Sequence, residues 1–175
     1  TSDIDISNQP IGPTLKFTAA QKIVFAQLSK AIKQGKFQPY LLHGVTGSGK
    51  TEIYIRCIQQ VLEQGKTAIM MVPEISLTPQ TVERFRQRFG DRVAILHSGL
   101  SQKERFIEWK KIYDRQVSIA VGARSAIFAP FSNLGIIVID EEHDGSYKQD
   151  SIPRYHARDT AVMRAHSQNA VILLG

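Results

Sequence analysis

Gly44-Val45-Thr46-Gly47-Ser48-Gly49-Lys50-Thr51 is the stretch that decides the fold, because it satisfies the phosphate-binding pattern G-x-x-x-x-G-K-[ST] at every position. Before it, Tyr40-Leu41-Leu42 predicts the end of a buried strand, and after it residues 52–58 predict a helix. In that setting the glycines let the backbone turn tightly and aim its N–H groups inward, as an anion-binding nest. Lys50 is then expected to reach the β- and γ-phosphates, and the Thr51 hydroxyl to bind Mg²⁺. A plain glycine-rich turn accounts for less of this pattern, so we predict a nucleoside triphosphate site.

Short apolar runs rich in β-branched residues recur along the rest of the chain, at 67–72, 93–96, 117–121, 136–139 and 170–174. Nearly all of them lack alternation, so they predict strands buried on both faces of a parallel sheet. Stretches with helical periodicity separate the runs. One begins near Thr78-Pro79, one covers about 157–166, and one begins with a Ser101/Glu104 capping box and carries Phe106, Trp109 and Tyr113. This alternation predicts a three-layer α/β domain with a mostly parallel central sheet, whose ligands bind at the carboxyl ends of the strands.

The stretch before the phosphate loop divides into an arm and a helix. Residues 1–16 are polar and without periodicity, which predicts a linker or arm. A helix is expected to follow Thr18, with Gly35 near its end. Thr18 and Gln21 fit a capping box, in which each side chain satisfies a free backbone donor at the helix start.

A second half of the nucleotide site is expected 90 residues after Lys50, where Ile136-Ile137-Val138-Ile139-Asp140-Glu141 predicts a strand that ends in two acids. An acidic residue at this tip of a strand can hold Mg²⁺, so Asp140 is expected to bind the metal directly or through water. Glu141 is expected to polarise the attacking water as the general base. The alternative is a solvated acidic turn, which the four β-branched residues before Asp140 disfavour. Together with the phosphate loop, the pair predicts hydrolysis of ATP or GTP.

Composition limits what the chain can be. Its 175 residues, 42% hydrophobic and 22% charged, are typical of one soluble globular domain, and a net charge of +6 is compatible with a polyanionic partner. The single Cys57 lies in an apolar run, which predicts a buried structural thiol and excludes a Cys-based zinc site within this chain. No run reaches the roughly 20 apolar residues of a membrane span, and no signal peptide is visible, so we expect a cytoplasmic protein with no membrane partner. The start without Met and the end on an apolar run predict a piece of a larger protein.

Several stretches resemble, in the same order, the motifs of superfamily 2 helicases. Asp140-Glu141-Glu142-His143 is similar to the DEAH-like box, 72–80 to motif Ia, 121–126 to motif Ib, and 17–21 to the Q motif that contacts adenine. The last match implies a base-reading role for Gln21, which competes with the capping box. A closer resemblance, to the bacterial primosomal replication-restart helicases, covers nearly all of residues 17–175. It rests on 44–52, 72–80, 96–99, 122–125, 140–144, 146–149 and 154–159.

This resemblance implies a RecA-like P-loop NTPase lobe, the first of two helicase lobes, cut before motif III is complete. The activity implied is that of an ATP-dependent 3′–5′ DNA helicase in replication restart and primosome assembly, with ATP and Mg²⁺ as cofactors. Thr51 and Asp140 would be the Mg²⁺ ligands. The implied partners are forked or single-stranded DNA and, for the full-length protein, other primosome proteins and single-strand-binding proteins. Zinc is expected only in a Cys-rich region outside this chain, and the second lobe would supply an arginine finger, so the isolated lobe should hydrolyse ATP poorly.

DNA contacts are expected from residues of motifs Ia and Ib and of the segment after the DEAH-like box, namely Thr78, Gln80, Arg124, Ser125, Tyr147, Lys148, Arg154 and Tyr155. Tyrosine faces can stack on unpaired bases while Lys and Arg meet phosphates. Structural alternatives stay open: Thr78 as an N-cap, Arg124 and Ser125 as loop anchors, and Tyr155 with His156 as caps of the next helix. His143 is better explained by coupling to the next lobe than by metal ligation. The arginines at 84, 86, 88 and 92 are interpreted as a solvated helix face.

Two other functions remain open at this point. The same motifs occur in double-strand translocases and restriction-type motors, which do not separate strands. From a different class, the chain could be a nucleotide-gated module that binds DNA or a protein without activity of its own.

Overall fold

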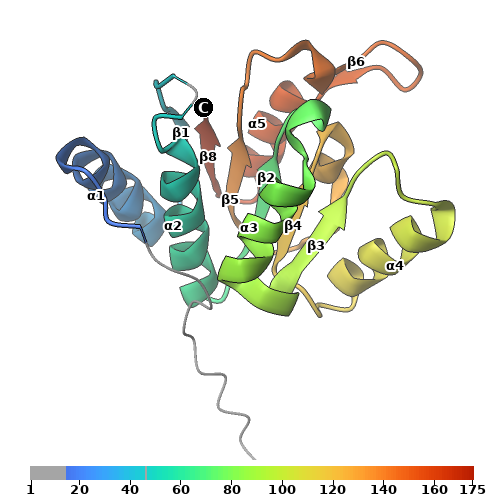
Figure 1. Ribbon diagram of the computed structural model, residues 1–175, viewed down its shortest axis with the longest axis horizontal. Coiled ribbons are helices and arrows are strands. Elements are labelled where there is room, and N and C mark those ends of the chain that lie inside the picture. The colour runs from blue at the N-terminus through green and yellow to red at the C-terminus, as the bar shows by residue number, and fades with distance from the viewer. Residues whose placement is uncertain (1–14, 46) are drawn as a thin grey trace, which may run out of the picture.

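The computed structural model describes residues 15–45 and 47–175 (Figure 1). Nearly all of the predicted arm, and Thr46 of the phosphate loop, therefore lie outside the described residues. Within the described part, six strands form one sheet in the order β1-β8-β5-β2-β4-β3. They are β1 (Gln38–Leu41), β2 (Thr67–Met71), β3 (Val93–Leu96), β4 (Ile119–Gly122), β5 (Leu134–Ile139) and β8 (Val171–Leu174). Every pairing between neighbours is parallel, which confirms the parallel sheet expected from the unbroken apolar runs.

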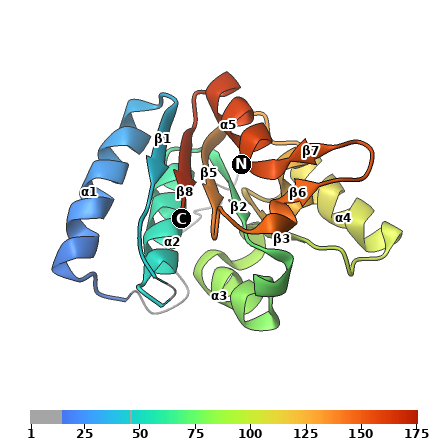
Figure 2. The ribbon, with the colours of Figure 1, turned by 90° about the horizontal axis from the view of Figure 1, so that it is seen from above.

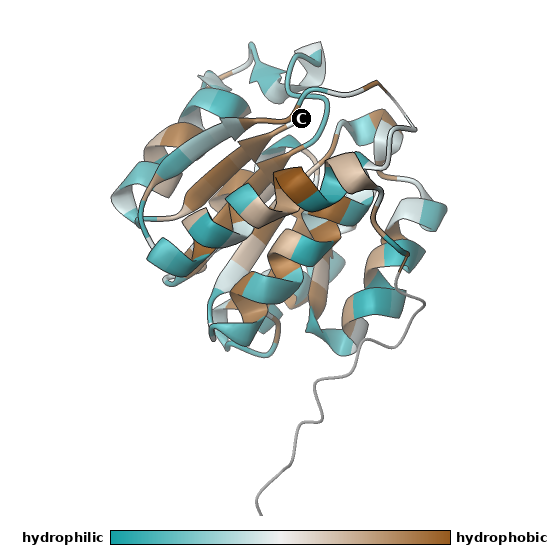
Figure 3. Ribbon diagram, turned by 90° about the vertical axis from the view of Figure 1, so that its left-hand side faces the viewer, coloured by the Kyte–Doolittle hydropathy of each residue, from teal (hydrophilic) through white to brown (hydrophobic). Residues whose placement is uncertain are grey.

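Helices cover both faces of this sheet, which confirms the three layers (Figure 2). The helices α1 (Ala19–Gln34), α2 (Lys50–Glu63) and α3 (Pro79–Phe89) pack on one face, against side chains such as Met70 and Val138. The helices α4 (Gln102–Tyr113) and α5 (Ala157–Ser167) pack on the other, against the alternate side chains such as Ile69 and Ile137. Figure 3 shows mostly hydrophobic strands between helices in which hydrophilic and hydrophobic residues alternate.

Side-chain caps define where most of these helices begin. Thr18 and Ser101 form the predicted capping boxes at α1 and α4, and Gly35 ends α1 in the left-handed conformation. Thr78 caps α3, and the His156 ring accepts a hydrogen bond from the backbone of Arg158 at the start of α5. Because these caps are local in sequence, the helix starts could be placed before the fold was known.

The apolar face of α4 is not the one predicted. Phe106 and Tyr113 are 66% and 76% exposed, whereas Ile112 is buried and Trp109 is partly buried. The reason is the position of α4 beside β3, the last strand of the sheet, where a helix has little apolar surface to cover. The prediction for Cys57 is confirmed: the thiol is fully buried, and burial raises its pKa to about 12, so it stays protonated.

A small hairpin projects from the carboxyl edge of the sheet and was not predicted. Its strands β6 (Lys148–Gln149) and β7 (Tyr155–His156) pair in antiparallel fashion just before α5. It follows a short 3₁₀ turn, η4 (Gly145–Tyr147), and its tip carries Ile152, which is 90% exposed. Similar turns, η1 (Glu74–Ser76) and η3 (Arg124–Phe128), follow β2 and β4, while η2 (Gly90–Arg92) leads from α3 into β3. No helix in the described part is both long enough and apolar enough to span a lipid bilayer.

Candidate functional site

The loop between β1 and α2 has the backbone that its glycines predict. Gly47 and Gly49 have φ angles of 82° and 84°, in the left-handed region that favours glycine. A Cβ added at Gly44 would lie 2.7 Å from the Ser48 hydroxyl oxygen, so a larger residue at this position would require the Ser48 side chain to move. The N–H of Ser48 donates to the carbonyl of Val45, which closes the turn. The described part of the loop is therefore shaped mainly by its glycines and its own backbone.

The start of α2 differs from the other helix starts. Gly49 occupies the cap position without a side-chain hydrogen bond, whereas the other α-helices of the described chain are capped by side chains. The first N–H groups of an α-helix have no partner within the helix, and they carry partial positive charge. Lys50 and Thr51, both half-buried, add an ammonium group and a hydroxyl at this point. This combination of donors fits the phosphates of a nucleotide.

The acidic end of β5 emerges beside this loop. Leu41 of β1 and Ile139 of β5 both lie level with Leu174 of β8, the strand between them. Neighbouring strands are about 4.8 Å apart, so the phosphate loop and Asp140 leave the sheet at the same edge, on the order of 10 Å apart. The Asp140 carboxylate and the Thr51 hydroxyl are oxygen ligands of the kind that Mg²⁺ prefers. The structure thus brings together the two remote segments that the sequence analysis singled out.

Two buried tyrosines hold Asp140. The Tyr54 hydroxyl, on α2, donates to Asp140 Oδ1 at 3.0 Å, and the Tyr147 hydroxyl donates to the Asp140 carbonyl at 2.6 Å. Both side chains are completely buried, and burial together with the charge of Asp140 raises the pKa of each phenol far above its ordinary value. Both therefore remain hydrogen-bond donors. Tyr54 was not among the predicted site residues, although its place one helical turn after Lys50 was a usable signal.

For Tyr147 the predicted DNA contact is wrong. Its ring has no exposed surface, and its hydroxyl is engaged with the backbone of Asp140. A ring buried under the sheet edge cannot stack on a base.

The rest of the acidic box lies at the surface. Glu141 has a φ angle of 51°, an uncommon conformation for this residue type, and its carboxylate lies 3.5 Å from His143 Nε2. Glu142 pairs with Arg158 of α5 at 3.1 Å, which ties the box to that helix. His143 is 74% exposed at its side chain, and no group of three or more metal-ligating side chains occurs in the described residues.

Gln21 forms the predicted capping box and also contacts the phosphate loop. Its amide oxygen accepts a hydrogen bond from the backbone of Thr18 at 2.9 Å. Its amide nitrogen lies 3.4 Å from the Gly49 carbonyl and 3.5 Å from that of Ser48. A Cβ on Gly49 would come within 2.2 Å of that nitrogen, so the fit is close. A contact with adenine stays a prediction.

Paired substitutions separate the two roles of Gln21. Thr18→Ala is expected to lower the free energy of unfolding by about 1 kcal/mol, because the cap of α1 is lost, and to leave the preference for ATP over GTP unchanged. Gln21→Ala is expected to reduce that preference severalfold. Chemical denaturation and competition binding of the two nucleotides measure these effects. An unchanged preference in Gln21→Ala would leave Gln21 with a structural role alone.

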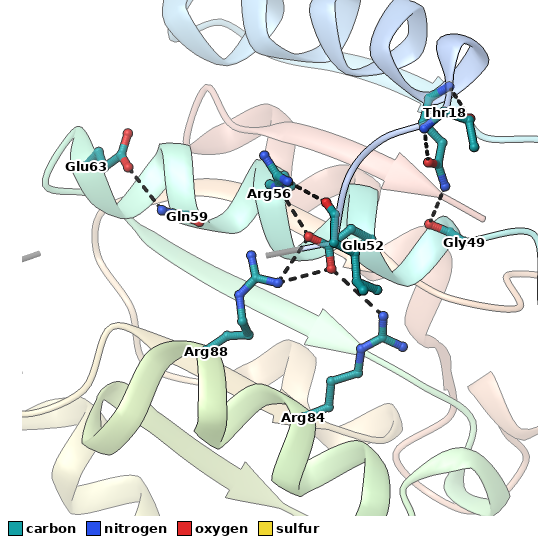
Figure 4. A network of polar contacts seen from close by, with 10 residues as sticks. Thr18, Gly49, Glu52, Arg56, Gln59, Glu63, Arg84 and Arg88 are labelled. Atoms are coloured by element: carbon teal, nitrogen blue, oxygen red, sulfur yellow. Dashed lines mark hydrogen bonds and ion pairs between the residues drawn. The ribbon is translucent and has the colours of Figure 1, made fainter. Parts of the chain in front are cut away.

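A buried ionic cluster lies directly behind the phosphate loop (Figure 4). Glu52 is 3% exposed, and both its oxygens accept from Arg88 Nη1 of α3 at 3.1 Å. Arg56 approaches the same carboxylate at 3.0 Å and Arg84 at 4.0 Å. The solvated face predicted for the arginines is therefore wrong for Arg88, which is 6% exposed because it lies on the same side of α3 as the buried Phe85 and Phe89.

Part of the predicted DNA-contact set lines one groove at the carboxyl edge of the sheet. This groove, of about 480 Å³, is bordered by Arg124, Ser125 and Tyr155, together with residues that were not predicted, including Arg105 and Ser98. Of the remaining predicted residues, Gln80, Lys148 and Arg154 are exposed on α3 and the hairpin.

Several of these residues also have the structural roles that were kept open. Thr78 caps α3 by accepting from the backbone of Thr81. Arg124 donates to the carbonyls of Lys148 and Ser146 and lies 5.9 Å from the centre of the Tyr155 ring, so it anchors the hairpin. Arg124 and Tyr155 also line the groove, so their structural contacts are compatible with a role on DNA.

Comparison with known proteins gives a consistent result. A family model described as DEAD/DEAH box helicase matches residues 18–174. Replication restart protein PriA of Bacillus subtilis (strain 168) is 54% identical over 161 residues, which cover 92% of this chain and 20% of that protein. The protein of the same name from Haemophilus influenzae is 47% identical over 161 residues, 92% of this chain and 22% of that protein. The chain thus spans about a fifth of the length of these curated relatives.

Solved structures share the fold at low sequence identity. RecG bound to a three-way DNA junction superimposes with a TM-score of 0.62 at 22% identity, over 91% of this chain and 21% of that one. The DNA-bound Type ISP restriction-modification enzyme LlaBIII gives 0.59 at 15% identity, over 93% of this chain and 13% of that one.

Proposed function

This chain belongs to the DEAD/DEAH box helicase family, and from that premise we propose that it is the ATP-binding lobe of an ATP-dependent DNA helicase. The observation that carries the proposal is the register of the sheet, which sets the phosphate loop and Asp140 on either side of β8 at one edge. A nucleotide bound there would contact hydrogen-bond donors of the phosphate loop on one side and the Asp140 carboxylate on the other.

The chain's own residues have separable tasks in this proposal. Lys50 and the first turn of α2 would bind the phosphates, and Thr51 and Asp140 would hold Mg²⁺. The bound ion would neutralise charge that develops on the phosphate oxygens. Glu141, next to Asp140 and exposed enough to reach solvent, would orient the attacking water and accept its proton.

We further propose that the protein containing this chain acts in replication restart, the process after which its relatives from Bacillus subtilis and Haemophilus influenzae are named, and that it does so in the cytoplasm. Its substrate would be forked or single-stranded DNA, unwound in the 3′–5′ direction, and its partners other primosome proteins and single-strand-binding proteins. Zinc would be bound only by parts outside this chain. The groove lined by Arg124, Ser125, Arg105 and Tyr155 supports the DNA role, because guanidinium and hydroxyl groups bind phosphates and an aromatic ring can stack on a base.

A strand-displacement assay on the protein that contains this chain tests the proposal. Forked duplexes with either a 3′ or a 5′ single-stranded tail are mixed with protein and ATP, with a non-hydrolysable ATP analogue as the control. We expect strand release with ATP only, preferentially from the 3′-tailed fork, together with ATP hydrolysis that single-stranded DNA stimulates.

Two other outcomes would contradict it in different ways. DNA-stimulated hydrolysis without strand release would indicate a double-strand translocase. Nucleotide-dependent DNA binding without hydrolysis would indicate a binding module.

A further inference from the structure

The Tyr54 hydroxyl lies where α2 meets the ends of β5 and β8. It donates to Asp140 Oδ1 at 3.0 Å, and the side chain has no exposed surface. On the other side, a Cβ added to Gly175 would lie 1.7 Å from the hydroxyl oxygen. The hydroxyl therefore occupies a slot that exists only because residue 175 is glycine.

The walls of this slot are fixed. The Gly175 N–H donates to the Ile139 carbonyl, and the Gly175 carbonyl accepts from the Glu142 N–H, both at 2.9 Å. The Tyr54 ring belongs to the buried core between α2 and the sheet, so it cannot swing away from Asp140 without disturbing that packing. Since a carboxylate has two oxygens in one plane, a fixed Oδ1 also restricts the direction of Oδ2.

Tyr54 also links the two halves of the site. It follows Lys50 by four residues on the same helix, so the helix that begins at the phosphate loop also holds the carboxylate of the acidic segment. The hydrogen bond between the Tyr54 and Asp140 side chains joins two segments that are 86 residues apart in the sequence.

We propose that Tyr54 is a positioning residue, which orients the Asp140 carboxylate for Mg²⁺ that accompanies the nucleotide; the inference rests on the proposed function above. Carboxylates that bind metals are themselves commonly hydrogen-bonded, and loss of such a supporting partner typically weakens metal affinity about 10- to 100-fold. Tyr54 touches neither phosphate nor metal in this scheme and acts only through Asp140.

The test measures binding, not turnover. The affinity of a fluorescent ADP for the chain is determined in EDTA and over a Mg²⁺ titration. Tyr54→Phe removes only the hydroxyl. Mg²⁺ is expected to increase the affinity for ADP, and in this variant the Mg²⁺ concentration that gives half of that increase should be about 10-fold higher. The affinity in EDTA is expected to stay within about twofold, because the phosphate loop is unchanged.

Two further variants make the test specific. Gly175→Ala is expected to give the same rise, because its methyl group displaces the Tyr54 hydroxyl without altering the tyrosine itself. Circular dichroism of both variants establishes that each is folded before its Mg²⁺ titration is compared with that of the unsubstituted chain. Tyr40→Phe is the control: it removes the hydroxyl of a partly buried tyrosine that contacts Gln38 and not Asp140, and the Mg²⁺ titration should not change.

The outcomes separate this inference from the proposed function. A Mg²⁺ titration unchanged in Tyr54→Phe and Gly175→Ala, or an equal loss of affinity with and without Mg²⁺, would overturn the positioning role. If the unsubstituted chain did not bind ADP, the proposed nucleotide site itself would be overturned, and ADP binding with no dependence on Mg²⁺ would overturn the proposed metal site at Asp140.

Discussion

Replacing Asp140 with asparagine is expected to lower DNA-stimulated ATP hydrolysis at least about 100-fold in the protein that contains this chain. Asparagine preserves the size of the side chain and can still accept the Tyr54 hydrogen bond, so the fold should persist. What is lost is the negative charge that would hold Mg²⁺ against the nucleotide. Lys50→Ala should have an effect of the same order, since it removes the ammonium group expected to meet the phosphates.

Matched controls come from charged residues away from the sheet edge that holds the site. Asp114→Asn, in an exposed pair with Lys110 at the end of α4, and Lys33→Ala, in the last turn of α1, should retain full turnover. Steady-state ATP hydrolysis with saturating single-stranded DNA is the measurement. Substantial turnover in Asp140→Asn would refute the assignment of this carboxylate to the metal.

Glu52→Ala is expected to have the largest effect on stability, a loss of about 3–5 kcal/mol in the free energy of unfolding. The substitution leaves the Arg88 guanidinium buried without its counter-charge, and two of the Arg88 nitrogens already lack a hydrogen-bond partner in the described residues. Urea denaturation followed by circular dichroism measures the change.

The surroundings of Glu52 provide two comparisons. Glu63→Ala, on an exposed position at the other end of α2, should change stability by no more than about 0.5 kcal/mol. The double variant Glu52→Leu/Arg88→Met should recover much of the loss, because apolar groups of similar volume often replace a buried ion pair at little cost. A loss below about 1 kcal/mol in Glu52→Ala would mean that water reaches Arg88 when its partner is removed.

The sequence predicted those parts of the fold that depend on local patterns. Apolar runs placed five of the six strands of the main sheet, the stretch before the phosphate loop placed the end of β1, and capping boxes placed the starts of α1 and α4. The meeting of the phosphate loop with Asp140 was also predictable, because parallel strands deliver their carboxyl ends to one edge. Each of these inferences needs only the residues of one segment and a general rule of sheet geometry.

The parts that were missed depend on which distant segments meet. Burial of Arg88 requires Glu52, 36 residues away, and the contact of Tyr54 with Asp140 spans 86 residues. Nothing in the sequence around Tyr147 distinguished an exposed ring that stacks on bases from a buried ring whose hydroxyl donates to the Asp140 carbonyl. For the same reason the sequence could name Arg124 as a phosphate ligand or a loop anchor but could not choose between them.

The outer edge of β1 has a consequence for how copies of this protein meet. The Leu42 N–H donates to the Leu174 carbonyl of β8. Backbone groups along a strand point alternately to its two sides, so those of Pro39 and Leu41 point to the outer edge of β1. Proline has no N–H to donate at that edge. A strand from another molecule would find a single donor along this short border instead of a regular ladder. The short β1 edge with its proline therefore disfavours extension of the parallel sheet on the side of the phosphate loop, and with it aggregation through that edge.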